Sequence, residues 1–145
     1  MPFFLCAQSN EISIKAVVVE DYKILIDQEI TYYNPSDLPM DTIYLLNWAN
    51  GYRDKKTPLN KRLIEDYDNS LYFAKRKDRG YSTIQKLESN GTALTFNELA
   101  NASDIVKVVL PSSLNPSESI KMEFTILYKS KQCYCNSHQN KPLLC

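Results

Sequence analysis

The residues best suited to chemistry lie at the C-terminal end of the chain. Three of the four cysteines and the only histidine occur there, as Cys133, Cys135, His138 and Cys145. Thiolate and imidazole groups bind zinc, and a tetrahedral site needs three or four such ligands. The spacing C-x-C-x2-H-x6-C differs from that of the well-attested zinc fingers, and the C-x-C step is awkward within one compact loop. A metal site, disulfide or free-thiol chemistry, and an unstructured terminus all stay open, and the sequence favours the last.

Few residues elsewhere suit nucleophilic or acid–base catalysis. A serine nucleophile needs a neighbouring base, and neither Ser82 nor Ser113 has one nearby in the sequence. The carboxylates of Glu65 and Asp66 lie beside lysines and an arginine. Such a mixture is typical of a solvated face rather than of an acid–base pair. The sequence therefore predicts no catalytic residue and no cofactor.

A basic run occupies residues 75–79, with the sequence KRKDR, between Tyr72 and Phe73 on one side and Tyr81 on the other. Cations interleaved with aromatic rings are a feature of nucleic-acid-binding surfaces. The formal net charge of the chain is zero, and aspartates are interleaved with the cations. A chain without a global basic field is not expected to bind nucleic acid or an anionic membrane. We therefore expect no nucleic-acid partner.

Length and composition predict one globular domain. A chain of 145 residues normally forms one domain and can bury a hydrophobic core. Its content of 43% hydrophobic and 23% charged residues is ordinary for a globular protein. No segment approaches the about 20 consecutive apolar residues that a membrane span requires.

Alternating apolar residues predict several strands. Residues 11–20 and residues 22–32 carry apolar side chains at every second position, and residues 119–129 show the same alternation most clearly. Residues 104–110 form another apolar run, which we expect to end at Pro111 because proline cannot donate a backbone hydrogen bond.

A hairpin and a buried strand complete the predicted sheets. Residues 82–88 and 92–96 flank Asn90-Gly91, a strong signal for a two-residue hairpin turn. Residues 40–48 carry apolar side chains at both even and odd positions. We therefore expect both faces of this strand to be covered.

The connection between these strands is expected to contain one short helix. Thr57 can cap it, with Pro58 at the first helical position. Residues 66–80 form a long excursion, which four apolar residues are expected to hold against the sheet: Tyr67, Leu71, Tyr72 and Phe73. The predicted fold is all-β, an antiparallel β-sandwich or saddle of about seven or more strands.

The two ends differ from the middle of the chain. Residues 3–7, FFLCA, are similar to the end of a secretory signal, although a basic region is missing before them, and an apolar first strand is the alternative. We expect a partial signal-like segment at residues 1–8, a β-sandwich domain at residues 9–129 and an irregular tail at residues 130–145. The expected location is secreted or periplasmic, or cytoplasmic if the chain is truncated.

The stretch QEITYYNPSDLPMDTIYLLNWANGYRDKKTPLNKRL, residues 28–63, has a distinctive order of features. A strand ends in Tyr-x-Asn, a short turn and a second apolar strand follow, and an Asn-x-Tyr exit leads to Thr-x-Leu. This order resembles the N-terminal domain of aminopeptidase N-like (gluzincin) zinc metallopeptidases, especially their secreted bacterial branch. The similarity extends over roughly residues 9–129, with Gly51 where that branch more often has alanine and with Pro35 inserted in the turn. The matching positions are Ile30, Tyr32, Asn34, Ser36, Leu38, Ile43, Leu45, Asn50, Tyr52, Thr57 and Leu59.

The resemblance implies a supporting role rather than catalysis. In that family the N-terminal β-sandwich packs on a catalytic domain, which carries the zinc signature His-Glu-x-x-His and the Gly-x-Met-Glu-Asn loop. Neither motif occurs in this chain, and one histidine cannot form the zinc site. The resemblance therefore predicts a non-catalytic domain, truncated or stand-alone, whose partner is a peptidase catalytic domain or another protein surface. It also predicts an exposed apolar face where that partner docks.

Two other hypotheses stay open. An independent secreted β-sandwich module could bind protein or carbohydrate through its loops and exposed tyrosines. A small hydrolase or metal-binding protein would have to use the tail. The abrupt change of composition after Lys129 also suggests that the tail is translated in a shifted frame.

Overall fold

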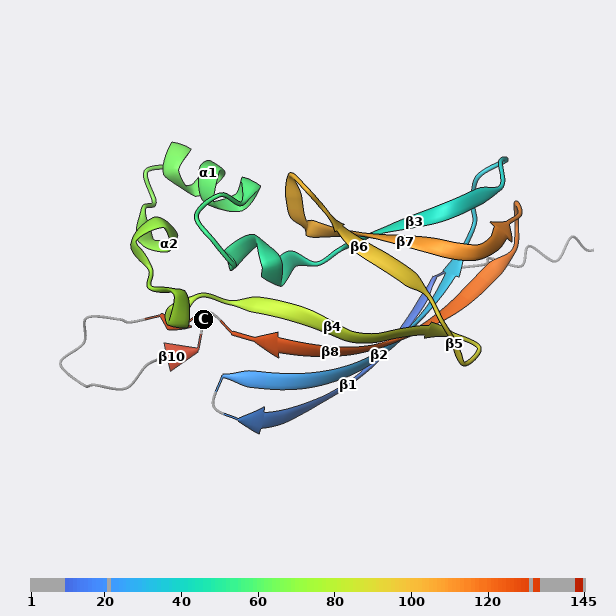
Figure 1. The fold of residues 1–145 in the computed structure, drawn as a ribbon, viewed down its shortest axis with the longest axis horizontal. Coiled ribbons are helices and arrows are strands. Elements are labelled where there is room, and N and C mark those ends of the chain that lie inside the picture. The colour runs from blue at the N-terminus through green and yellow to red at the C-terminus, as the bar shows by residue number, and fades with distance from the viewer. Residues whose placement is uncertain (1–9, 21, 131, 134–142, 145) are drawn as a thin grey trace, which may run out of the picture.

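The computed structural model describes residues 10–20, 22–130, 132–133 and 143–144. Two antiparallel sheets pack face to face, one of five strands in the order β1-β2-β8-β4-β5 and one of three in the order β3-β7-β6 (Figure 1). This arrangement confirms the predicted all-β sandwich. The strands are β1 (Glu11–Glu20), β2 (Lys23–Tyr33), β3 (Met40–Leu46), β4 (Tyr81–Ser89), β5 (Thr92–Ala93), β6 (Thr95–Leu99), β7 (Ala102–Leu114) and β8 (Ser119–Lys129).

Two further strands lie in the segment that was predicted to be an irregular tail. They are β9 (Gln132–Cys133) and β10 (Leu143–Leu144), which pair with each other in an antiparallel manner. The long connection between β3 and β4 holds the helical turns η1 (Trp48–Tyr52) and η2 (Arg76–Asp78) and the helices α1 (Pro58–Glu65) and α2 (Ser70–Phe73). Within the described ranges no helix is long and apolar enough to cross a membrane.

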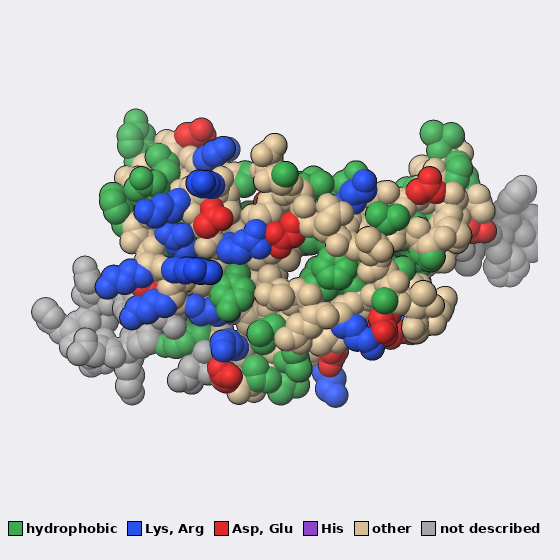
Figure 2. Space-filling view, viewed as in Figure 1, with side chains coloured by type: hydrophobic (Ala, Val, Ile, Leu, Met, Phe, Trp, Pro, Cys, Tyr) green, Lys and Arg blue, Asp and Glu red, His purple; other side chains and the backbone are tan. Residues whose placement is uncertain are grey.

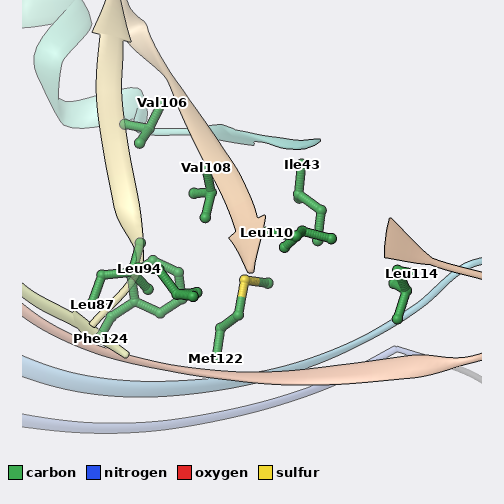
Figure 3. Close-up of a cluster of buried hydrophobic side chains, with 9 residues drawn as sticks. All are labelled: Ile43, Leu87, Leu94, Val106, Val108, Leu110, Leu114, Met122 and Phe124. Carbon is green, nitrogen blue, oxygen red and sulfur yellow. The ribbon is translucent and has the colours of Figure 1, made fainter. Parts of the chain in front are cut away.

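The hydrophobic core lies between the two sheets (Figure 3). The alternation of β8 directs Met122 and Phe124 into it, as the sequence predicts, and both are buried. Val106 and Val108 of β7 approach from the smaller sheet and are also buried. The full cluster comprises Ile43, Leu87, Leu94, Val106, Val108, Leu110, Leu114, Met122 and Phe124.

The predicted hairpin turn is confirmed, but its second strand divides between the two sheets. Asn90 and Gly91 adopt φ angles of 50° and 74°, the left-handed values that a tight hairpin turn needs. Of the two strands that follow the turn, β5 pairs with β4, whereas β6 pairs with β7 of the other sheet. Leu94 is buried at the crossing point, where its N–H donates to the carbonyl of Leu87 at 2.9 Å. The chain therefore joins the sheets at the core rather than through a loop.

The expectation that Pro111 ends a strand is wrong. Strand β7 continues to Leu114, and Pro111 lies in an irregular segment of its pairing with β3. Met40 pairs with Leu114 and Thr42 with Val109, so β7 carries extra residues between these two pairs. Such a bulge leaves backbone N–H groups unpaired and therefore tolerates a proline.

The prediction for residues 40–48 is wrong in two respects. Strand β3 ends at Leu46, and Trp48 begins the turn η1. Only one face is covered, because Ile43 is buried whereas Tyr44 and Leu46 are exposed. The reason is that, in the described part of the chain, no layer covers the outer face of the smaller sheet, where Val109 of the central strand β7 is exposed as well.

The helical excursion agrees with the sequence at its start and departs from it later. Thr57 caps α1 by accepting a hydrogen bond from the N–H of Asn60 at 3.3 Å. The sequence predicts one helix in this connection, whereas the structure has a second helix, α2. Leu71 alone among the four predicted anchors is buried, and Tyr67 and Phe73 are highly exposed. The excursion lies at one end of the sandwich (Figure 1).

Truncation of Val108 tests the assignment of the core. Val108→Ala should lower the free energy of unfolding by about 2 kcal/mol, because it removes buried methyl groups and leaves a cavity. Val109→Ala is the matched control on the same strand, since Val109 is 39% exposed and Val108 is 0% exposed. Urea denaturation of both variants measures the difference. Equal losses in the two variants would contradict the described packing.

Candidate functional site

The inner face of the larger sheet extends beyond the core. Directly paired residues of neighbouring strands point to the same face. Ile12 pairs with Ile30 of β2, which pairs with Met122. Ile14 lies in the next inward row, which leads through β2 to Phe124. Because Met122 and Phe124 point into the core, Ile12 and Ile14 belong to the same face.

This extension is not covered by the smaller sheet. Every residue of β1 is exposed, including Ile14 at 60% and Val18 at 74%. A five-stranded sheet packs here against a three-stranded one, so its far edge lacks a partner layer. We call the uncovered region the open apolar face, and it consists of Ile12, Ile14, Ala16, Val18, Ile24 and Ile26.

A pocket of about 240 Å³ lies where the open apolar face meets the smaller sheet. Ile12 and Ile126 line it from the larger sheet, and Leu45 and Val106 line it from the smaller sheet. Among the described residues that line it, the polar groups are the side-chain amides of Gln28 and Asn47, and none is titratable. This lining suits an apolar group with one or two hydrogen bonds.

The outer face of the same sheet is charged instead. A shallow pocket of about 330 Å³ there is lined by carboxylates and lysines. Lys86 pairs with Glu88 and Lys121 with Glu29, each at 2.7 Å. The hydrogen bond that Lys121 donates to Glu29 raises the pKa of Lys121, and the one that Lys86 donates to Glu88 raises the pKa of Lys86. Paired charges of this kind form a solvated surface and contribute little to stability.

The residues considered for catalysis do not come together in the structure. Ser82 is buried, where its hydroxyl donates to Oδ1 of Asn47 and its N–H to Oδ1 of Asn50 at 2.9 Å. The hydroxyl of Ser113 donates to a carboxylate oxygen of Asp41 on the neighbouring strand. Both serines therefore have structural partners.

The acidic candidate Asp66 has a structural partner, and only one of the metal-binding candidates lies within the described residues. Asp66 pairs with Arg62 at 3.0 Å on the exposed side of α1. Of the four tail candidates, Cys133 lies in β9, whereas Cys135, His138 and Cys145 fall outside the described residues. In the described part of the chain no three His, Cys, Asp or Glu residues could hold one metal ion. A metal site in the tail stays a hypothesis.

A buried polar cluster, which the sequence did not indicate, fixes the helical end of the sandwich. Asn50 is fully buried, and its Nδ2 donates to Oε1 of Glu98 at 2.9 Å. Arg53 donates to both oxygens of Glu98, at 2.9 and 2.7 Å. This hydrogen bond raises the pKa of Arg53, so the guanidinium stays charged. Together with the bond from Ser82, the cluster joins η1 to β4 and β6.

Asn34 has a similar role at the opposite end. It is fully buried, and its Nδ2 donates to the carbonyls of Leu38 and Leu114 at 3.0 and 2.9 Å. Its Oδ1 accepts from the N–H of Ser36 at 3.0 Å. Asn34 and Asn50 are both among the positions that resemble the peptidase family. Their hydrogen bonds show that these shared polar positions shape turns rather than a binding site.

Comparisons with known proteins give one structural similarity. No family model matches the sequence, and no curated protein matches it. Among solved structures, the chain is similar to part of an M1 zinc metallopeptidase mutant from Deinococcus radiodurans that was crystallised with a Tyr-Ser-Ala substrate. The identity is 11% and the TM-score 0.42, over 79% of this chain and 18% of that chain. The chain thus spans less than a fifth of that protein, and a similarity of this size carries no argument about function.

Substitution of Asn50 tests the buried polar cluster. Asn50→Ala should lower the free energy of unfolding by about 2–3 kcal/mol, because the buried N–H of Ser82 and the carboxylate of Glu98 each lose a partner. Asn97→Ala is the control, since Asn97 is exposed and donates only to the carbonyl of Glu98 at 3.3 Å. That control should change stability by no more than about 0.5 kcal/mol. Denaturant unfolding measures the stability of both variants. An Asn50→Ala variant as stable as the wild-type chain would disprove the structural role of Asn50.

Proposed function

We propose that this chain is a non-catalytic β-sandwich domain that supports a zinc peptidase catalytic domain, which the chain itself does not contain. The observation that carries the proposal is the open apolar face, which exposes Ile12, Ile14 and Val18 on one edge of the sandwich. A contiguous exposed apolar patch marks a site of protein interaction. The similarity of residues 28–63 to the aminopeptidase N-like family names the kind of partner.

The docking surface can be described from the chain's own residues. The pocket beside Leu45 can accept an apolar side chain, and Gln28 and Asn47 can hydrogen-bond a backbone group next to it. Among the described residues, strand β1 pairs with β2 alone, so its other edge can take up a strand from the partner. The zinc ion would belong to the partner, since the described residues of this chain do not fit a zinc site.

The proposed location is outside the cytoplasm, either secreted or periplasmic. The support for it is the signal-like sequence of residues 3–7. We further propose that the chain is a fragment of a longer peptidase-like protein or a stand-alone copy of its first domain.

A second candidate function is favoured by exposed aromatic side chains near the end of β3. Tyr44 and Trp48 are 59% and 56% exposed, and the Trp48 ring lies edge-on to Tyr52 at a centroid distance of 6.4 Å. Rings held in this way present apolar faces with polar tips, which suits an independent module that binds protein or carbohydrate. Such a module would hold its ligand without a catalytic domain.

Self-association of the purified chain tests the open apolar face. The wild-type chain should associate weakly at high concentration, because the face remains exposed to water. Ile14→Lys should abolish this association, whereas Ser13→Lys, which adds the same charge on the opposite face of β1, should not. Sedimentation velocity over a concentration series measures it. A wild-type chain that stays monomeric throughout, or equal effects of both substitutions, would contradict the proposal.

The identity of the partner is tested by the DNA that follows the codon of Lys129. If the chain is a fragment, this DNA, read in all frames, should encode a His-Glu-x-x-His segment, and its absence would overturn the proposal that the chain is a fragment. The protein encoded there should bind the wild-type chain and Ser13→Lys in a pull-down, but not Ile14→Lys. The chain alone, supplied with zinc, should hydrolyse no aminoacyl substrate above background.

A further inference from the structure

The zero net charge of the chain conceals a strong separation of charge. Residues 53–79 contain nine Lys and Arg and five Asp and Glu residues, a formal net charge of +4. The rest of the chain contains eight Lys and Arg and twelve Asp and Glu residues, a formal net charge of −4. In the structure the cations gather at the helical end of the molecule (Figure 2). A charge dipole of this kind orients a protein toward an anionic partner.

Part of this end presents cations and aromatic rings without carboxylates. We call it the basic aromatic surface, and its seven exposed residues are Lys55, Lys56, Tyr72, Phe73, Lys75, Arg76 and Lys77. Asp78, the next residue, is buried. The carboxylate of Asp66 is paired with Arg62. Beside it, the half-buried carboxylate of Asp54 accepts a hydrogen bond from the N–H of Lys56 at 2.6 Å. The surface itself carries five positive charges and no exposed carboxylate among its seven residues.

The two rings of this surface do not contribute to the core. Phe73 is 76% exposed and Tyr72 is 40% exposed, while Leu71 anchors α2 in their place. The rings contact each other edge to face at 5.2 Å. The ammonium group of Lys55 lies 4.7 Å from the centre of the Tyr72 ring, which links residues 55 and 56 to the α2–η2 segment. An apolar patch is thus held in the middle of a cationic one.

The cations that face solvent are mainly lysines. Three of the four arginines have fixed partners: Arg53 binds Glu98, Arg62 binds Asp66, and Nη2 of Arg79 donates to the carbonyl of Ala74 at 2.8 Å. Among the described residues, no ion pair involves Lys75, Arg76 or Lys77. Lysine acts as a hydrated point charge without the directional fork of arginine. It therefore suits a surface of diffuse negative charge better than a fixed carboxylate.

We propose that the basic aromatic surface binds the anionic face of a lipid bilayer. The surface belongs to the helical excursion, which lies at one end of the sandwich, the same end as β10 (Figure 1). A flat surface can approach this end without contacting the faces of the two larger sheets. Aromatic rings settle at the headgroup level of a bilayer, and adjacent lysines are attracted to lipid phosphates. This proposal is independent of the proposed peptidase partner.

A nucleic acid fits these observations less well. An extended phosphate chain would have to run beyond the five cations, toward the end of α1. There it would meet Glu65, Asp66 and Asp68, all of which are exposed. The remainder of the chain has a net charge of −4 and would repel it further. A bilayer, in contrast, would contact only the helical end of the molecule.

Co-sedimentation with vesicles tests the proposal. The full chain should bind vesicles of phosphatidylcholine with phosphatidylglycerol, should not bind phosphatidylcholine alone, and should dissociate as salt is raised. The triple variant Lys75→Gln, Arg76→Gln, Lys77→Gln should partition about 100-fold more weakly, since each cation near an anionic surface contributes about fivefold. Phe73→Ser should weaken binding several-fold at unchanged charge.

The control is a triple variant with the same change of net charge on the outer face of the larger sheet, namely Lys15→Gln, Lys86→Gln and Lys121→Gln. It should bind the anionic vesicles as the wild-type chain does. Circular dichroism confirms that each variant is folded. The proposal is overturned by absence of binding to anionic vesicles, by equal losses in both triple variants, by equal binding to duplex DNA at the same salt, or by release with millimolar glycerol phosphate.

Discussion

The unequal width of the two sheets is the constraint on which the rest of this structure depends. Strand β8 lies at the centre of the five-stranded sheet, and its inward residues Met122 and Phe124 meet Val106 and Val108 of the smaller sheet. Three strands cannot cover five, so the inward rows continue past the core onto β1. The alternation that buries Met122 therefore also exposes Ile12 and Ile14. The core and the open apolar face are two parts of one apolar sheet face, and they differ only in whether a layer lies above them.

Buried asparagines let this small sandwich carry long connections. A polar side chain that is removed from water is costly unless all its groups find partners. Asn34 and Asn50 satisfy that demand by binding backbone groups and Glu98, and each thereby fixes one end of the sandwich. Thr57 does the same on a smaller scale at the start of α1. The polar positions of residues 28–63 are thus accounted for by the shape of the turns, which leaves the apolar face and the basic end as surfaces available to partners.

The sequence predicts correctly the features that depend on residues close together in the chain. Its predictions are wrong for features that depend on contacts between distant segments. The alternation of β1, β2 and β8, the Asn90-Gly91 turn and the Thr57 cap depend on residues a few positions apart. Whether a face of β3 is covered depends on how distant segments of the chain pack. The sequence of residues 40–46 contains no information about that packing. Strand β7 continues past Pro111 because of a bulge, and a bulge arises from the pairing of two strands that lie far apart in the sequence. For the same reason a net charge of zero gave no sign of the separation of +4 from −4.

The two surfaces lie on different elements, and this separation matters for any function the domain performs. The open apolar face belongs to β1 and β2, whereas the basic aromatic surface belongs to the segment from Lys55 to Lys77. Contacts on the first are hydrophobic and depend little on salt, while contacts on the second weaken as salt is raised. Because no described residue belongs to both surfaces, occupation of one leaves the other's contacts intact. A domain built in this way can hold a protein partner on its sheet edge and meet an anionic surface with its helical end at the same time.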